Sequence, residues 1–150
     1  RVVGLTAPKP GALNREQMYK MDKGGSQGFA PRAQRYLAEA DVARRNNQRP
    51  AEAAYLNNAI NSGLTGEELR AAHLRLGDVF LQQGDAVRAL VAFREANKVR
   101  PGSDALNRIG VACERTGEPK GAREAYEQSL QLDPGNAEAK AGLERVRAAG

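Results

Sequence analysis

Apolar residues recur at helical spacing along the chain from Pro31 onward. A recurrence every three or four residues places apolar side chains on one face of a helix. No stretch shows the alternation of apolar and polar residues, with β-branched enrichment, that is typical of a strand. The pattern therefore predicts an all-α protein. Seven helices are expected, at residues 31–47, 50–61, 66–83, 86–98, 103–116, 119–131 and 136–148.

Proline and glycine punctuate this pattern. Prolines stand at the expected start of three helices, where the first turn loses no intrahelical hydrogen bond: Pro31, Pro50 and Pro119. Residues 1–30 differ from the rest, because two prolines and five glycines interrupt any regular period. We expect these residues to form a flexible or partner-docking N-terminal arm. The first residue is Arg1 rather than Met, which indicates a processed product or an excised fragment.

An internal repeat is visible when the chain is compared with itself at an offset of 33 residues. The paired positions are Leu76-Gly77 with Ile109-Gly110, Phe80 with Cys113, Gly84 with Gly117, Ala89 with Ala122, Phe93 with Tyr126 and Pro101 with Pro134. The order of a mid-helix glycine, an alanine and an aromatic four positions apart, and a closing proline resembles the tetratricopeptide repeat over residues 70–134.

This resemblance implies a right-handed superhelical solenoid of antiparallel helix pairs. Residues 66–102 and 103–135 are then two good repeats, residues 31–65 a degenerate one, and residues 136–150 a capping helix with a charged outer face. Each mid-helix glycine costs about 1 kcal/mol against alanine. We interpret both glycines as points where the two helices of a repeat approach closely. The expected facing residues are Ala89 opposite Gly77 and Ala122 opposite Gly110, with Phe93 and Tyr126 filling the space between adjacent helices.

The net charge of +5 does not indicate a nucleic-acid partner. Residues 1–50 hold ten Lys or Arg against four Asp or Glu, whereas residues 51–150 hold thirteen against fourteen. The one tight basic group, Arg44, Arg45 and Arg49, lacks the interleaved aromatic residues on which single strands stack. We interpret this group as a solvated helix end.

Residues that could carry chemistry are few. His73 is the only histidine and Cys113 the only cysteine, and both fall on packing positions of the repeat. No catalytic or phosphate-binding motif is present. We therefore expect no enzymatic activity, cofactor, metal or small-molecule substrate. No apolar run approaches the roughly 18 residues needed to span a bilayer.

In the family that the chain resembles, the first helices of the repeats line a concave groove that holds a partner peptide. The resemblance places eleven residues on this groove: Ala71, Leu74, Asp78, Leu81, Gln82, Asp104, Asn107, Arg108, Val111, Glu114 and Arg115. Eight of them are the predicted partner-binding residues: Leu74, Asp78, Leu81, Asn107, Arg108, Val111, Glu114 and Arg115. The two-Lys, two-Asn and Arg clamp of the chaperone-binding members is not expected, because Leu74 and Asp78 stand where a clamp Lys and Asn would be. The leucines and Val111 are candidate apolar anchors. The alternative is that some of them pack beneath the preceding hairpin.

These observations predict a non-catalytic adaptor that binds a peptide or helix of a partner protein in its groove. Short bacterial tetratricopeptide lipoproteins, or pilotins, suggest a role in assembly of a pilus or secretion complex. That role implies the periplasmic face of the outer membrane, reached through a lipid anchor. The alternative is a regulatory or scaffold domain excised from a larger protein or enzyme.

Overall fold

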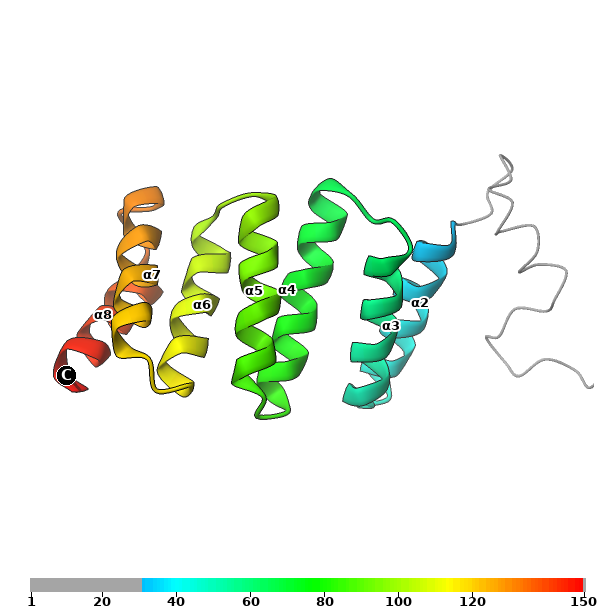
Figure 1. The fold of residues 1–150 in the computed structure, drawn as a ribbon, viewed down its shortest axis with the longest axis horizontal. Coiled ribbons are helices and arrows are strands. Elements are labelled where there is room, and N and C mark those ends of the chain that lie inside the picture. Colours follow the sequence, from blue (N-terminus) through cyan, green and yellow to red (C-terminus); the bar gives the residue numbers. More distant parts are fainter. Residues whose placement is uncertain (1–30, 150) are drawn as a thin grey trace, which may run out of the picture.

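The computed structural model describes residues 31–149, which form seven helices and no strand (Figure 1). The helices are α2 (Arg32–Arg45), α3 (Arg49–Asn61), α4 (Gly66–Gln82), α5 (Ala86–Val99), α6 (Ser103–Arg115), α7 (Pro119–Leu132) and α8 (Ala137–Ala149). Each lies within two residues of its predicted bounds, so the all-α prediction is confirmed. The predicted arm at residues 1–30 lies outside the described residues.

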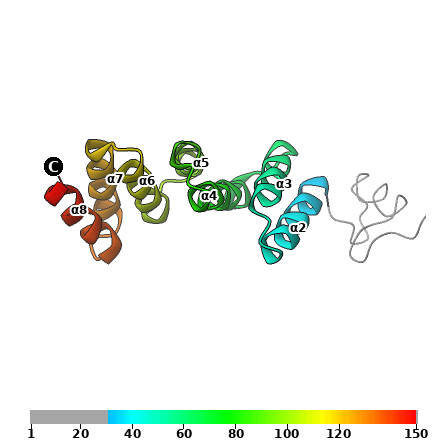
Figure 2. The ribbon, with the colours of Figure 1, turned by 90° about the horizontal axis from the view of Figure 1, so that it is seen from below.

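The helices stand side by side in chain order along the long axis of the molecule (Figure 1). α2 packs on α3, α4 on α5 and α6 on α7, and each of these hairpins also contacts the next one. Seen from below, α3 and α5 lie on one side of α2 and α4 (Figure 2). Successive hairpins therefore stack as a solenoid in which each covers the apolar face of its neighbour.

Tight turns of one kind join the two helices within each of the two good repeats. Gly84 follows α4 with a φ of 81° and Gly117 follows α6 with a φ of 78°. A left-handed residue ends a helix without a steric penalty only where Cβ is absent. The 33-residue spacing of these two glycines thus sets the same exit geometry in both repeats.

The core is built mainly from alanine, with one aromatic ring in each good repeat. Phe93 of α5 and Tyr126 of α7 are fully buried, as is Leu56 at the matching place in α3. Cys113 is fully buried beside them, and burial raises the pKa of its thiol. The interpretation of Cys113 as a small core residue is confirmed. Within the described range no helix is both long and apolar enough to cross a membrane.

The mid-helix glycines make room for these rings, and here the predicted contact needs a correction. A Cβ on Gly77 would lie 2.5 Å from Cδ1 of Phe93, and a Cβ on Gly110 would lie 2.5 Å from Cε1 of Tyr126. The close approach between the two helices of a repeat is therefore real. The group that needs the space is the ring, however, and not Ala89 or Ala122 as predicted.

Ion pairs join successive first helices along the solenoid. Asp41 of α2 pairs with Arg75 of α4, and Glu114 of α6 pairs with Arg145 of α8. Two further pairs link α4 to α6: Arg70 with Asp104 and Asp78 with Arg108. The partners in these pairs are 30 to 34 residues apart in sequence, close to one repeat length. The same side of every hairpin is thus tied to the next by opposite charges.

Candidate partner-binding groove

A hollow of about 440 Å³ lies between the first helices of the two good repeats and the start of α8. Its lining residues are Asp78, Leu81, Ser103, Asp104, Asn107, Arg108, Val111, Asn136 and Glu138. We call this hollow the groove. It is formed because α4, α6 and the start of α8 present the same face side by side, while α5 and α7 pack behind them.

Five of the eight predicted partner-binding residues line this groove: Asp78, Leu81, Asn107, Arg108 and Val111. The other three, Leu74, Glu114 and Arg115, do not line it. Leu74 is half-buried and packs against the C-terminal core cluster, the group of buried residues that includes Phe93, Cys113, Tyr126 and Leu143. This contact fits the alternative that Leu74 packs beneath a hairpin. Arg115 is exposed at the end of α6.

Leu81 and Val111 are the two apolar side chains of the groove. Both are half-buried, and both also pack against the C-terminal core cluster. A side chain held from behind by the core presents its open face without the entropy cost of being ordered on binding. These two residues can therefore receive an apolar side chain of a partner.

Opposite charges at the groove are already matched. Arg108 donates from Nε to Oδ1 of Asp78 at 2.9 Å and from Nη2 to Oδ2 at 3.3 Å. Each side chain is between one third and one half exposed. The pair is accordingly accessible to a partner's polar groups, but it offers no uncompensated charge to attract a strongly charged ligand.

Asn107 uses its side-chain amide to link α6 to α7 and to the start of α8. Only 4% of it is exposed, and its Nδ2 donates to Asn136 Oδ1 at 2.9 Å and to Glu138 Oε2 at 3.4 Å. Its Oδ1 accepts from Ser129 Oγ at 2.7 Å. With both amide hydrogens and its oxygen engaged, Asn107 shapes the wall of the groove by fixing α7 and the start of α8.

Glu114 takes part in a second such network, one turn beyond Val111 toward the C-terminal end of α6. It accepts the hydroxyl hydrogen of Tyr126 and is bridged by Arg145, with Nε 3.1 Å from Oε1 and Nη2 3.0 Å from Oε2. Arg145 chiefly, and then Tyr126, lower the pKa of Glu114, while burial beside this carboxylate raises that of Tyr126. This network fastens the last helix to the core.

Replacing Arg145 by Met should therefore loosen α8. We expect the loss of this bridge to lower the free energy of unfolding by about 1 kcal/mol, because the pair is half-exposed. Amide hydrogens of α8 should exchange faster with solvent, as hydrogen-exchange mass spectrometry would detect. Arg147→Met is the matched control, because Arg147 is on the same helix and forms no ion pair with another residue of the range 31–149. Equal acceleration in both variants would contradict the proposed fastening.

Three groove residues escaped the sequence-based prediction, namely Ser103, Asn136 and Glu138, whereas Asp104 lies in the groove as the repeat positions predicted. Ser103 and Asp104 begin α6, and Glu138 lies in the first turn of α8. Asp104 forms a bidentate pair with Arg70, which lowers its pKa to about 2. The signal that could have found Asn136 is the repeat itself, because Asn136 follows Ser103 by 33 residues.

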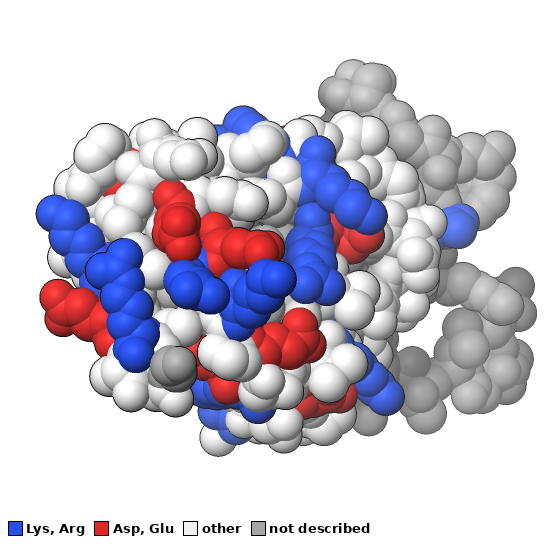
Figure 3. Space-filling view, turned by 60° about the vertical axis from the view of Figure 1, so that its left-hand side comes forward, with Lys and Arg blue, Asp and Glu red and all other residues white. Residues whose placement is uncertain are grey.

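The surface shows no separate field of positive charge in the view of Figure 3, where basic and acidic side chains lie beside one another. His73 is half-buried, and burial lowers its pKa; its Nδ1 has no hydrogen-bond partner among the described residues. In residues 31–149 no three His, Cys, Asp or Glu side chains are placed to hold a metal ion.

Comparison with known proteins gives the same architecture. Residues 74–137 match the family model described as tetratricopeptide repeat. The type IV pilus assembly protein PilF of Pseudomonas aeruginosa is 35% identical over 81 residues, which cover 53% of this chain and 32% of PilF. The chain therefore spans about one third of the length of that relative.

Solved structures share the fold at low sequence identity. The structure of MamA superposes with a TM-score of 0.71 at 18% identity, covering 87% of this chain and 73% of MamA. The first tetratricopeptide domain of Spaghetti (RPAP3), bound to an HSP90 peptide, has a TM-score of 0.68 at 15% identity, covering 78% of this chain and 91% of that domain. These likenesses establish the fold of the described helices.

Proposed function

We propose that this chain, a tetratricopeptide repeat protein over residues 74–137, is a non-catalytic adaptor that binds a segment of a partner protein in its groove. The observation that carries the proposal is the pair Leu81 and Val111, held from behind by the core and open to a hollow of about 440 Å³. Burial of a partner's apolar side chain against them supplies the affinity. The ion pair between Asp78 and Arg108, which lies beside these two residues, favours one register of the partner segment along the groove.

We further propose that the partner belongs to a pilus or secretion complex. The support is the resemblance to PilF, whose name describes a type IV pilus assembly protein. Under this proposal the chain acts during assembly by holding one component until it is handed on. A lipid anchor upstream of Arg1 would then be its connection to the outer membrane.

A second candidate follows from the share of PilF that is covered. Because the chain matches only 32% of that relative, the described helices can equally serve as one interaction domain within a larger protein. A regulatory or scaffold domain would use the same groove on a different partner. The identity of the captured protein separates the two candidates.

Introducing a charge at the apolar residues of the groove should weaken capture of the partner. We expect Leu81→Glu and Val111→Glu each to weaken partner binding at least about tenfold, because a carboxylate would replace the apolar contact. Arg94→Glu on the exposed side of α5 is the control and should leave binding unchanged. The measurement is quantitative mass spectrometry of proteins co-purified with the full-length protein and each variant, with circular dichroism confirming that each variant is folded.

Proteins lost with both groove variants and retained with Arg94→Glu are the groove's partners. A pilus or secretion component among them supports the assembly role, and a domain of another system supports the scaffold role. Equal loss from all three folded variants would show that binding occurs elsewhere on the molecule.

A further inference from the structure

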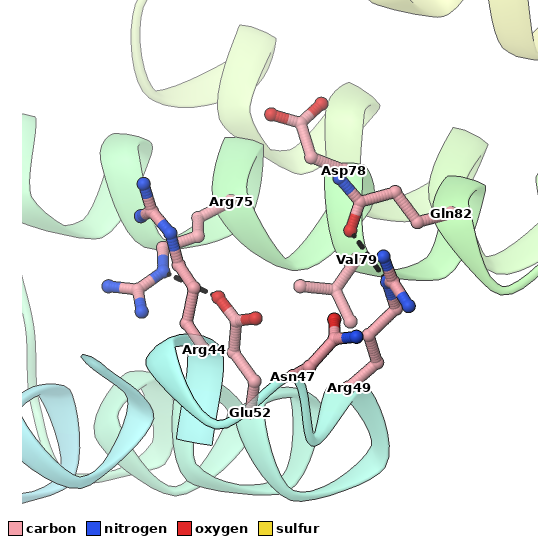
Figure 4. Close-up of a pocket in the computed structure, with 8 residues that line it drawn as sticks. All are labelled: Arg44, Asn47, Arg49, Glu52, Arg75, Asp78, Val79 and Gln82. Carbon is pink, nitrogen blue, oxygen red and sulfur yellow. Dashed lines mark hydrogen bonds and ion pairs between the residues drawn. The ribbon is translucent and has the colours of Figure 1, made fainter. Parts of the chain in front are cut away.

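A second hollow, of about 310 Å³, lies between the turn joining α2 to α3 and the C-terminal half of α4 (Figure 4). Its lining residues are Arg44, Asn47, Arg49, Glu52, Arg75, Asp78, Val79 and Gln82. We call it the arginine pocket. Asp78 belongs to both linings, so the arginine pocket continues the groove toward the N-terminal hairpin.

The two carboxylates in the arginine pocket are already neutralised. Glu52, only 4% exposed, accepts a hydrogen bond from Arg75 Nε at 2.9 Å. Asp78 pairs with Arg108 on the groove side. Neither carboxylate is thus left to balance the remaining positive charge of the pocket.

The arginines of the pocket, by contrast, still have hydrogen-bond donors without acceptors among the described residues. Arg75 donates from Nε to Glu52 and pairs through Nη1 with Asp41, but its Nη2 is buried and has no acceptor among the described residues. A buried donor without a partner is costly, and an incoming acceptor would relieve that cost. Arg75 therefore provides a donor fixed in place by two carboxylates.

Two further guanidinium groups flank this donor. Within residues 31–149, Arg44 and Arg49 form no ion pair, although Arg49 donates from Nε to Gln82 Oε1 at 3.1 Å. Figure 4 shows the guanidinium groups of Arg44 and Arg75 together on one side of the hollow and that of Arg49 on the other. An anion seated between them would meet hydrogen-bond donors from both sides.

We propose that the arginine pocket binds the side-chain carboxylate of an acidic residue in the partner segment, an inference that rests on the proposed function. Planar guanidinium groups match a carboxylate with paired, charge-assisted hydrogen bonds. With the ion-pair partners Asp41 and Arg108 included, four arginines and three carboxylates leave a formal charge of +1, which a single carboxylate neutralises. A phosphate, with nearly two negative charges, would leave an excess near Glu52 and Asp78.

This inference specifies the chemistry of the partner. A segment that places an apolar side chain against Leu81 and Val111 and continues past Asp78 brings its next residues to the arginine pocket. We therefore expect the segment to carry an apolar residue followed or preceded by Asp or Glu. Selection then comes from two sites of different chemistry rather than from apolar burial alone.

The test uses the full chain and small probes, because the partner is unidentified. The probes are the acetylated N-methylamide of glutamate, the same derivative of glutamine, and inorganic phosphate. Arginine Nε–Hε resonances are followed by NMR during titration. We expect saturable shifts at Arg49 and Arg75 with the glutamate probe and none with the neutral glutamine probe.

Variants assign the binding to the pocket. Arg44→Gln and Arg49→Gln should each weaken binding of the glutamate probe about tenfold, through loss of a charged hydrogen bond. Arg45→Gln makes the same change of charge at the exposed neighbour that does not line the pocket, and should leave the affinity unchanged. Equal loss in Arg45→Gln, equal response to the glutamine probe, or tighter binding of phosphate than of the glutamate probe would overturn the proposal.

Failure here is distinguishable from failure of the proposed function. If the glutamate probe does not bind while Leu81→Glu and Val111→Glu still lose their partner, the arginine pocket is wrong and the groove stands. If the probe binds but neither groove variant loses a partner, the adaptor role of the groove is wrong.

Discussion

Replacing Gly77 by alanine should lower the free energy of unfolding by about 2 kcal/mol, although alanine favours a helix by about 1 kcal/mol. The new Cβ would lie 2.5 Å from Cδ1 of the fully buried Phe93, whose ring has no open space into which to move. Gly110→Ala should behave alike against Tyr126. Urea denaturation monitored by circular dichroism measures both effects.

Gly121→Ala is the matched control, because it adds the same methyl group to a helix with less obstruction. Its Cβ would lie 3.2 Å from Cys113 Sγ, a contact that a small shift relieves. We expect its stability to stay within about 1 kcal/mol of the parent, because the helix propensity that alanine gains offsets the closer contact with Cys113. If Gly77→Ala and Gly110→Ala are as stable as Gly121→Ala, the rings do not need the space assigned to them.

Gly142 extends this argument to the last helix. A Cβ there would lie 2.6 Å from Cε1 of the same Tyr126 ring that fills the space beside Gly110. Tyr126 is therefore packed between glycines of α6 and α8, and both must stay free of side chains. The capping helix α8 thus has the same feature as α4 and α6, a glycine that leaves room for a buried aromatic ring.

Helix positions were predictable because a single physical signal determined them. The apolar period and the prolines fixed all seven helices to within two residues, and the 33-residue offset identified which helices are equivalent. The resemblance to the repeat family placed Leu81 and Val111 on the groove, and the structure puts both there. Periodic features are readable because each depends on its own helix alone.

Contacts between helices were not predictable in the same way. The sequence shows Asn107 and Glu114 as polar residues at groove positions, but each is engaged by side chains from two other helices. Nothing in the sequence around Arg75 distinguishes it from other helix residues, but in the structure it forms ion pairs with both Asp41 and Glu52. Such networks depend on how neighbouring hairpins sit, which no spacing within one helix records.

The prediction of which residue faces each glycine failed for a related reason. Alanine opposite glycine is a natural expectation for two helices in close contact. In this solenoid the aromatic residue four positions further along turns its ring back over the glycine instead. The repeat predicted correctly that space is needed, but side-chain direction decided which group uses it.

The pair between Arg70 and Asp104 should contribute the largest electrostatic effect on stability. Arg70 is 3% exposed and donates from Nη1 and Nη2 to the two oxygens of Asp104, at 2.9 and 2.6 Å, and from Nε to the Arg100 carbonyl oxygen at 2.8 Å. Asp104→Asn leaves this buried guanidinium without a counterion, and we expect a loss of about 3 kcal/mol. Arg70→Met should cost less, because the half-exposed Asp104 can be hydrated.

The pH dependence of unfolding gives this prediction an independent readout. Arg70, as the main cause, lowers the pKa of Asp104 from 3.8 to about 2. Since the folded state binds fewer protons than the unfolded chain between these values, the pair stabilises fully above pH 3.8, and its contribution falls as the pH drops toward 2. The difference in melting temperature between the parent and Asp104→Asn should therefore shrink across this window, while the control Asp133→Asn, on an exposed turn, shows no such change. If the difference in melting temperature stays constant from about pH 5 to about pH 2, to within the error of the melting curves, then Arg70 does not hold Asp104 ionised.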